Sequence, residues 1–132
     1  MTSRQRGNSA AQDFPTDRRL AVRDARTGAW QIVDRESIDW IRTAGRGRVR
    51  ASVGGRQQTW KIKISDVERR LDPNVSFRIH RSVIVNADRI REVKPLQKGE
   101  YAITLADGTV FDSGRTHRTV IERFLERLRG GR

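Results

Sequence analysis

Two polar residues with catalytic potential, His80 and Ser82, lie two positions apart in a segment typical of a β-strand. Residues two apart on a strand share a face, so this spacing could pair a nucleophile with a general base. The neighbouring sequence supplies no pattern for the third group that would orient the base, and the carboxylates are scattered and mostly flanked by arginine. The glycines at 45 and 47 lie between two expected strands and open no helix, unlike those of a nucleotide-binding loop. The sequence therefore argues against an enzyme.

The residue types also offer little for a metal or a cofactor. The chain has no cysteine and two histidines, which excludes thiolate zinc sites and disulfides and leaves few imidazoles for a metal centre. We expect neither a metal nor a cofactor. No apolar run approaches the roughly 18 residues of a membrane span, and the N-terminus has no apolar leader. We therefore expect no membrane contact and a cytoplasmic location.

Arginine is the residue type that dominates the chemistry of this chain. Of 132 residues, 28 are Lys or Arg against 16 Asp or Glu, which gives a formal charge of +12, and 24 of the 28 are Arg. The guanidinium fork suits phosphates and base edges better than an ammonium does. The stretch from 42 to 56 has no acid and contains Arg42, Arg46, Arg48, Arg50 and Arg56. Uncompensated charge of this density favours contact with a polyanion.

The elements that must position these arginines are mostly strands. Residues 1–18 are polar and without periodicity, which predicts a disordered basic arm, and residues 19–132 form the folded domain. Apolar alternation and turn residues predict strands at 20–22, 30–33, 38–44, 48–53, 58–62, 77–80, 83–85, 101–105 and 109–111. The fold class is therefore mainly β.

Two short helices complete the expected elements. Ser65 and Glu68 have the spacing of a capping box, which predicts a helix from Ser65 as N-cap through Leu71. A second helix is expected over 115–129, with one apolar face made of Val120, Ile121, Phe124, Leu125 and Leu128. The tryptophans at 30, 40 and 60 lie within strand patterns and are expected in the core.

The stretch from Phe77 to Ile90 carries a longer motif. An aromatic residue is followed closely by His80-Arg81-Ser82, then by an aliphatic residue with Val85-Asn86, and four positions later by Ile90. This string resembles the signature of the LytTR DNA-binding domain, and the resemblance covers roughly residues 20–128. It implies a fold of about ten strands in small stacked sheets with short helices. It also implies a sequence-specific regulator of transcription that inserts loops into successive major grooves of duplex DNA.

Three loops matter in this resemblance, at 45–48, 80–82 and 113–115. Arg81 and Arg115 are expected to contact base edges, since arginine can bridge guanine O6 and N7. Arg46 and Arg48 would contact bases or phosphates, and Ser82 and Lys98 would hold phosphates. His80 either contacts DNA or orients its loop. The first loop departs from the family pattern in its Gly-Arg-Gly-Arg sequence, and Gly114 separates Ser113 from Arg115.

The resemblance also implies partners. We expect repeated or tandem half-sites on the DNA and two copies of the chain bound there. Only about 20 residues precede the domain, too few for a receiver domain, so we expect a separate signalling partner or control by abundance. Two other classes stay open: a small basic RNA-binding protein, and a module that binds an acidic protein surface. Few aromatics look exposed, which disfavours binding to single strands by stacking.

Overall fold

The computed structural model describes residues 17–130. Within this range the chain forms ten strands: β1 (Arg19–Arg23), β2 (Trp30–Asp34), β3 (Ile38–Thr43), β4 (Val49–Val53), β5 (Arg56–Trp60), β6 (Ser76–His80), β7 (Val83–Asn86), β8 (Ile90–Pro95), β9 (Tyr101–Leu105) and β10 (Val110–Asp112). Two α-helices accompany them, α1 (Ile64–Glu68) and α2 (Arg118–Leu128). Four single turns of 3-10 helix are η1 (Arg35–Ser37), η2 (Ala87–Arg89), η3 (Gln97–Gly99) and η4 (Arg115–His117). The mainly β fold of ten strands is confirmed, and all but the last two residues of the expected arm lie outside the described residues.

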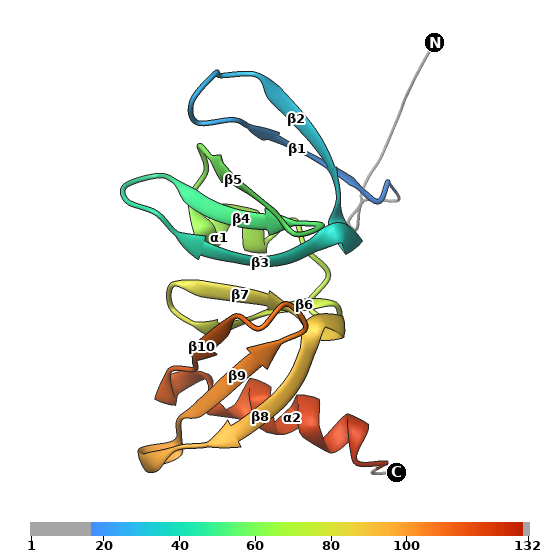
Figure 1. The fold of residues 1–132 in the computed structure, drawn as a ribbon, viewed down its shortest axis with the longest axis vertical. Coiled ribbons are helices and arrows are strands. Elements are labelled where there is room, and N and C mark those ends of the chain that lie inside the picture. Colours follow the sequence, from blue (N-terminus) through green and yellow to red (C-terminus); the bar gives the residue numbers. More distant parts are fainter. Residues whose placement is uncertain (1–16, 131–132) are drawn as a thin grey trace.

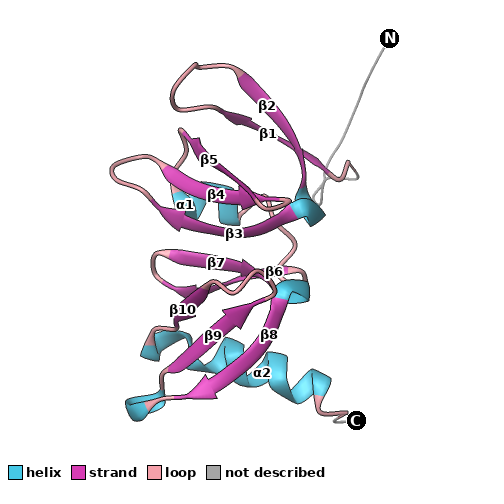
Figure 2. Cartoon of the chain, viewed as in Figure 1, coloured by secondary structure: helices cyan, strands magenta, loops and turns pink. Residues whose placement is uncertain are grey.

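A central sheet of five strands, in the order β5-β4-β3-β7-β6, organises the molecule. The hairpin β1-β2 and helix α1 lie on one side of it, and the sheet β10-β9-β8 with helix α2 lies on the other (Figure 1). All the strand pairs are antiparallel. Figure 2 shows how little helix accompanies these strands.

The two middle strands of the central sheet, β3 and β7, have buried residues on both faces, which explains their residue pattern. Ile41 of β3 and Ile84 of β7 belong to one hydrophobic cluster with Trp60. Trp40 and Val85, their neighbours in sequence, belong to a second cluster on the opposite face. Successive side chains of a strand point to opposite faces, so adjacent apolar residues supply two separate cores. Strand β7 is consequently buried along its whole length.

Nine of the ten strands lie at or within two residues of their expected positions, and β8 was missed. Its sequence, Ile90 to Pro95, has two half-buried residues separated by two exposed ones, so it does not alternate. Strand β8 forms an edge of its sheet, where it pairs only with β9. An edge position tolerates both the polar residues and the terminal proline.

The expected start of the first helix was wrong. The N-cap of helix α1 lies two residues earlier, at Lys63, so the helix begins at Ile64, and Lys63 makes no side-chain cap bond. Ser65 therefore lies inside the first turn, and the helix ends at Glu68 instead of Leu71. The second helix begins at Arg118, because residues 115–117 form the 3-10 turn η4.

Trp30, which was expected in the core, and Leu128, which was expected on the apolar face of the second helix, are exposed. Trp30 is 61% exposed and Leu128 is 69% exposed, whereas Trp40 and Trp60 are buried as expected. Trp30 lies on the outer face of β2, with the Arg23 guanidinium 4.9 Å from the centre of its ring. A strand in a two-stranded hairpin has one solvated face, which alternation alone cannot identify. Among residues 17–130, no helix is long and apolar enough to cross a membrane.

Candidate nucleic-acid interface

The three expected loops all lie at one end of the central strands. The β3–β4 loop, the β6–β7 turn and the segment from β10 into η4 extend toward the left edge in Figure 1. We call residues 44–48, 80–82 and 114–117 together the loop edge. Hydrogen bonds between backbone atoms connect its three parts: Thr43 N–H donates to the Ser82 carbonyl (3.0 Å) and Gly114 N–H donates to the Ile79 carbonyl (2.8 Å).

The β3–β4 loop is short and exposed throughout. Ala44 N–H donates to the Arg48 carbonyl (3.0 Å), so the loop closes over three residues. Gly45 and Gly47 have φ values of 104° and 64°, which a side chain would disfavour. The register of β3 and β4 continues up to this loop, with Thr43 opposite Val49, and both Arg46 and Arg48 are exposed.

The β6–β7 turn is held by two of its own neighbours. The Ser82 N–H donates to His80 Nδ1 (3.0 Å), which links the imidazole to the backbone of the turn. The Arg78 guanidinium donates to the Arg81 carbonyl (2.9 Å) and pairs with Glu68 of α1 (3.2 Å). The Arg81 side chain itself is exposed.

Gly114 places the third loop against the second. A Cβ at this position would lie 3.5 Å from His80 Cδ2 and 3.4 Å from His117 Nδ1. These are ordinary van der Waals distances, so the third loop packs closely against the second at this glycine. Burial lowers the pKa of His117, and the positive charge of Arg78 adds to this effect, although Glu68 opposes it.

The remaining expected residues differ in their surroundings. Arg115 is exposed, with its Nε 4.0 Å from a Glu100 carboxylate oxygen. Ser113 is 2% exposed and its Oγ accepts the Tyr101 N–H (3.0 Å), so it supports β9 instead of facing solvent. Lys98 is exposed on η3 with a left-handed backbone (φ 62°), beside Gly99, which packs against Arg118 at the start of α2. Ser82 is half-buried.

Positive charge on the first two loops and the adjoining parts of β3 and β4 is not neutralised within the described part of the chain. Within residues 17–130, no carboxylate pairs with Arg42, Arg46, Arg48, Arg50 or Arg81. In the register of β3 and β4, Arg42 lies directly opposite Arg50. Like charges opposite each other on a sheet are destabilising. This end of the sheet is therefore suited to bind an anion.

Sequence analysis gave no role to Arg78, although the residue belongs to the motif. Its apolar neighbours Phe77 and Ile79 are buried in the core, so strand alternation places Arg78 and His80 on the other face. That alternation was visible in the sequence. The contacts with the Arg81 carbonyl and with Glu68 depend on the turn and on α1, and no local pattern indicates them.

Comparison with known proteins identifies the family. The LytTr DNA-binding domain family matches residues 29–126, and the chain belongs to this family. The class of function of this family is DNA binding in the regulation of transcription.

Two relatives show how far the similarity extends. The chain is 27% identical over 94 residues to the sensory transduction protein LytT of Bacillus subtilis (strain 168), which covers 71% of this chain and 39% of that protein. It thus spans about two fifths of that relative. The fold is similar to a Bacillus cereus structure described as the LytTr DNA-binding domain of a methyl-accepting/DNA response regulator. The TM-score is 0.69 at 17% identity, over 83% of this chain and 97% of that one.

Proposed function

We propose that the chain regulates transcription by binding a specific sequence of duplex DNA with its loop edge. The observation that carries this proposal is the convergence of three loops that expose arginines. Among the described residues, Arg46, Arg48 and Arg81 have no acidic partner, and Arg115 has only a long, exposed ion pair with Glu100. Arg81 and Arg115 contact base edges, and Arg46 and Arg48 contact bases or phosphates as the loops enter successive major grooves. Ser82 and Lys98 hold phosphates, and His80 positions the turn.

The arrangement of the loops supports this mode of binding. The parts of the loop edge are joined by backbone hydrogen bonds, so their spacing is largely formed before DNA binds. Preorganised groups lose less conformational entropy on association. Helix α2 packs beneath the loops, with Ile121 and Phe124 buried, and so it supports the site instead of entering a groove.

Titration of labelled duplex DNA, matched RNA and heparin at several salt concentrations tests the proposal. If five or six phosphates are neutralised, the log–log slope of DNA affinity against salt should be about −4.5 to −5.5. Duplex DNA of a selected sequence should bind more tightly than the RNA or heparin. A slope near zero would exclude binding to a polyanion.

One observation favours the RNA-binding alternative, so the test includes RNA. Trp30 is exposed, with Arg23 against its ring, and an exposed aromatic can stack on an unpaired base. Equal or tighter binding of the RNA, with quenched tryptophan fluorescence that the Trp30→Ala variant abolishes, would favour that alternative. Binding of DNA with unchanged Trp30 fluorescence would exclude it.

In this proposal, two copies bind tandem half-sites about one helical turn apart. Either a separate partner protein brings the input signal, or the abundance of the chain itself controls its activity. A domain of this size covers a short site, so a second copy supplies the additional contacts that specificity requires. Sedimentation should show a monomer without DNA and a complex with two chains on a duplex carrying two half-sites. A tight dimer without DNA would contradict this arrangement.

A further inference from the structure

Arg78 is an arginine of the motif for which the proposed DNA contacts provide no role. It lies in the middle of β6, where Phe77 and Ile79 are buried in the second hydrophobic cluster, and its side chain, on the opposite face, is 19% exposed. Its Nε is buried and has no hydrogen-bond partner within residues 17–130. Burial of a charged group is unfavourable unless other contacts compensate for it. The contacts of the two other guanidinium nitrogens must therefore offset this cost.

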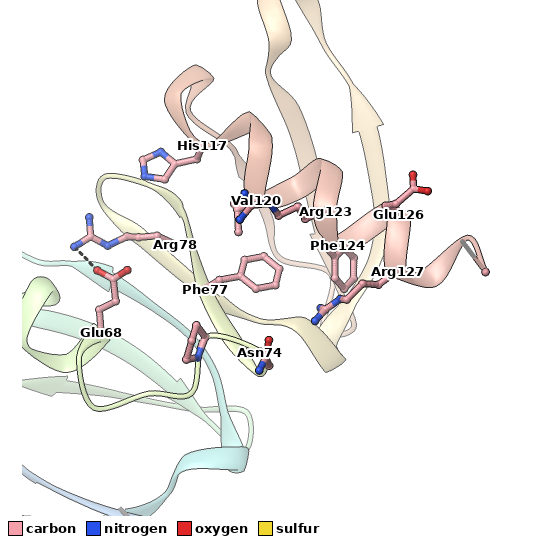
Figure 3. A pocket seen from close by; sticks show the side chains of 12 residues that line it. Glu68, Asn74, Phe77, Arg78, His117, Val120, Arg123, Phe124, Glu126 and Arg127 are labelled. Carbon is pink, nitrogen blue, oxygen red and sulfur yellow. Dashed lines mark ion pairs between the residues drawn. The ribbon is translucent and has the colours of Figure 1, made fainter. Parts of the chain in front are cut away.

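Those two nitrogens join the β6–β7 turn to helix α1. Nη1 of Arg78 donates to the Arg81 carbonyl (2.9 Å), and Nη2 pairs with a Glu68 carboxylate oxygen (3.2 Å), as the dashed line in Figure 3 marks. A guanidinium is planar, so the ion pair with Glu68 also restricts the direction in which Nη1 points. Glu68 thus holds Arg78 in the orientation that the bond to the Arg81 carbonyl requires.

The Arg81 carbonyl belongs to the same peptide group as the Ser82 N–H. That N–H donates to His80 Nδ1 (3.0 Å), so the side chains of Arg78 and His80, on one face of β6, hold this peptide group at both of its polar atoms. A peptide group is planar, and a plane held at two points has little freedom to rotate. The backbone around Arg81 is thereby held, and with it the direction in which the exposed Arg81 side chain leaves the turn.

We propose that Arg78 is a positioning residue for Arg81, and that it sets the preference at one base position without contacting DNA itself. This inference rests on the proposed base contact of Arg81. A precise binding site requires that the residues behind each contacting side chain hold it in its productive geometry. A role in stability alone explains the contacts less well, because a largely buried ion pair adds little net stability compared with apolar residues of similar volume.

A double-variant cycle with Arg78→Lys and Arg81→Ala tests the proposal by fluorescence anisotropy. Lysine keeps the charge but has no planar group to bridge the Arg81 carbonyl and Glu68. Arg78→Lys should weaken binding to the selected duplex about tenfold, as expected for loss of a charged hydrogen bond. Binding to a duplex changed at the base position that Arg81→Ala relaxes should fall less than about twofold, so the preference there becomes smaller. In the Arg81→Ala background, Arg78→Lys should add less than about twofold, because both changes remove the same interaction.

Two further variants complete the design. Glu68→Ala removes the support of Arg78 without changing the turn, and it should weaken binding to the selected duplex about threefold with the same lack of additivity. This variant carries the test if Arg78→Lys does not fold. The matched control is Arg69→Lys, at the C-cap of the same helix, where the arginine forms an exposed ion pair with Asp66. The control should change DNA affinity less than about twofold.

The outcomes separate this inference from the proposed function. A folded Arg78→Lys variant that keeps the full base preference overturns the inference, as do losses that are additive in the double variant or equal on the two duplexes. In each of these cases the unaltered chain still prefers the selected duplex, and the proposed function stands. An unaltered chain without any preference, or an Arg81→Ala variant that keeps all of it, would overturn the base contact of Arg81 and this inference with it.

Discussion

The two ends of the central sheet use polar side chains in opposite ways. Strand β3 runs from one end, at Ile38, to the loop edge, at Thr43. At the first end, which we call the network end (residues 36–39, 52–55 and 86–89), polar groups bind one another. Asn86 donates to the Ile38 carbonyl (2.8 Å) and accepts the Asp88 N–H (2.9 Å), and it is 1% exposed.

Asp39 is the centre of the network end. Its carboxylate accepts hydrogen bonds from the Arg89 guanidinium (2.8 Å), the Ser52 hydroxyl (2.8 Å) and the Gly55 N–H (3.0 Å). Burial raises the pKa of Asp39, but the hydrogen bonds from Arg89, Gly55 and Ser52 together lower it below the usual value. These bonds therefore stabilise the fold at neutral pH and are lost as the pH falls through this lowered pKa.

Three of the four arginines at the loop edge have no such partners within the described part of the chain, and the fourth, Arg115, has only the long pair with Glu100. Arg89 is used inside the fold, whereas Arg46, Arg48 and Arg81 are exposed and without a carboxylate partner there. Charge that stabilises the fold and charge that is available for a ligand are thus separated to opposite ends of the same strands. The comparison predicts that variants at the network end change stability and variants at the loop edge change DNA affinity.

Asn86→Ala should have the largest effect, on stability. It leaves the Ile38 carbonyl and the Asp88 N–H without their partner, at a cost of about 2–3 kcal/mol in the free energy of unfolding. Urea denaturation measures this loss. Asn74→Ala, at an exposed asparagine, is the matched control and should stay within about 0.5 kcal/mol. Unchanged stability in Asn86→Ala would contradict the structural role of the network end.

Arg81→Ala should have the next largest effect, on DNA affinity. Loss of a bidentate contact with guanine should cost about 1–3 kcal/mol and relax the preference at one base position. Its melting temperature should be retained, because within residues 17–130 no carboxylate pairs with the Arg81 side chain. Binding to selected and random duplexes, measured by fluorescence anisotropy, separates base contact from phosphate contact.

The matched control for Arg81→Ala is Arg91→Ala. Arg91 is also exposed, and its guanidinium donates to the Asp88 carbonyl (2.8 Å) near the network end. Its removal should change DNA affinity only slightly. Equal losses on random and selected DNA for Arg81→Ala would mean that this arginine binds phosphate. A large fall in its melting temperature would instead assign it to the fold.

The elements of this fold could be predicted wherever one strand face carries a consistent residue pattern. Strands such as β9, with its alternating buried residues, were located within a residue or two. Edge strand β8 and the exposed Trp30 were not, because their environment depends on which neighbours cover them. Local sequence also misplaced the start of α1, where Lys63 lies at the N-cap although Ser65 offered a better capping side chain.

The candidate site was predictable in its members but not in its geometry. The motif around His80 and Arg81 and the basic 42–56 segment indicated the loops. Contacts between loops, such as Gly114 N–H to the Ile79 carbonyl, join residues far apart in the sequence and leave no local signal. The ion pair between Arg115 of η4 and Glu100, just before β9, also leaves no local signal in the sequence. This pair affects how far the Arg115 side chain is free to contact DNA.

Arg115 and Glu100 give the smallest expected effects and the finest test of the comparison. Their ion pair is long and exposed, at 4.0 Å with side chains 66% and 41% exposed, and exposed pairs contribute little stability. Arg115→Ala should therefore weaken specific DNA binding by about 1 kcal/mol, the lower limit for a base contact.

Glu100→Gln should strengthen DNA binding about twofold, because it removes a negative charge at the rim of the interface. Glu126→Gln makes the same change of charge at the far end of α2, and a smaller gain there is expected. Equal gains in the two glutamine variants would show that only net charge matters, and that the third loop lies outside the DNA interface.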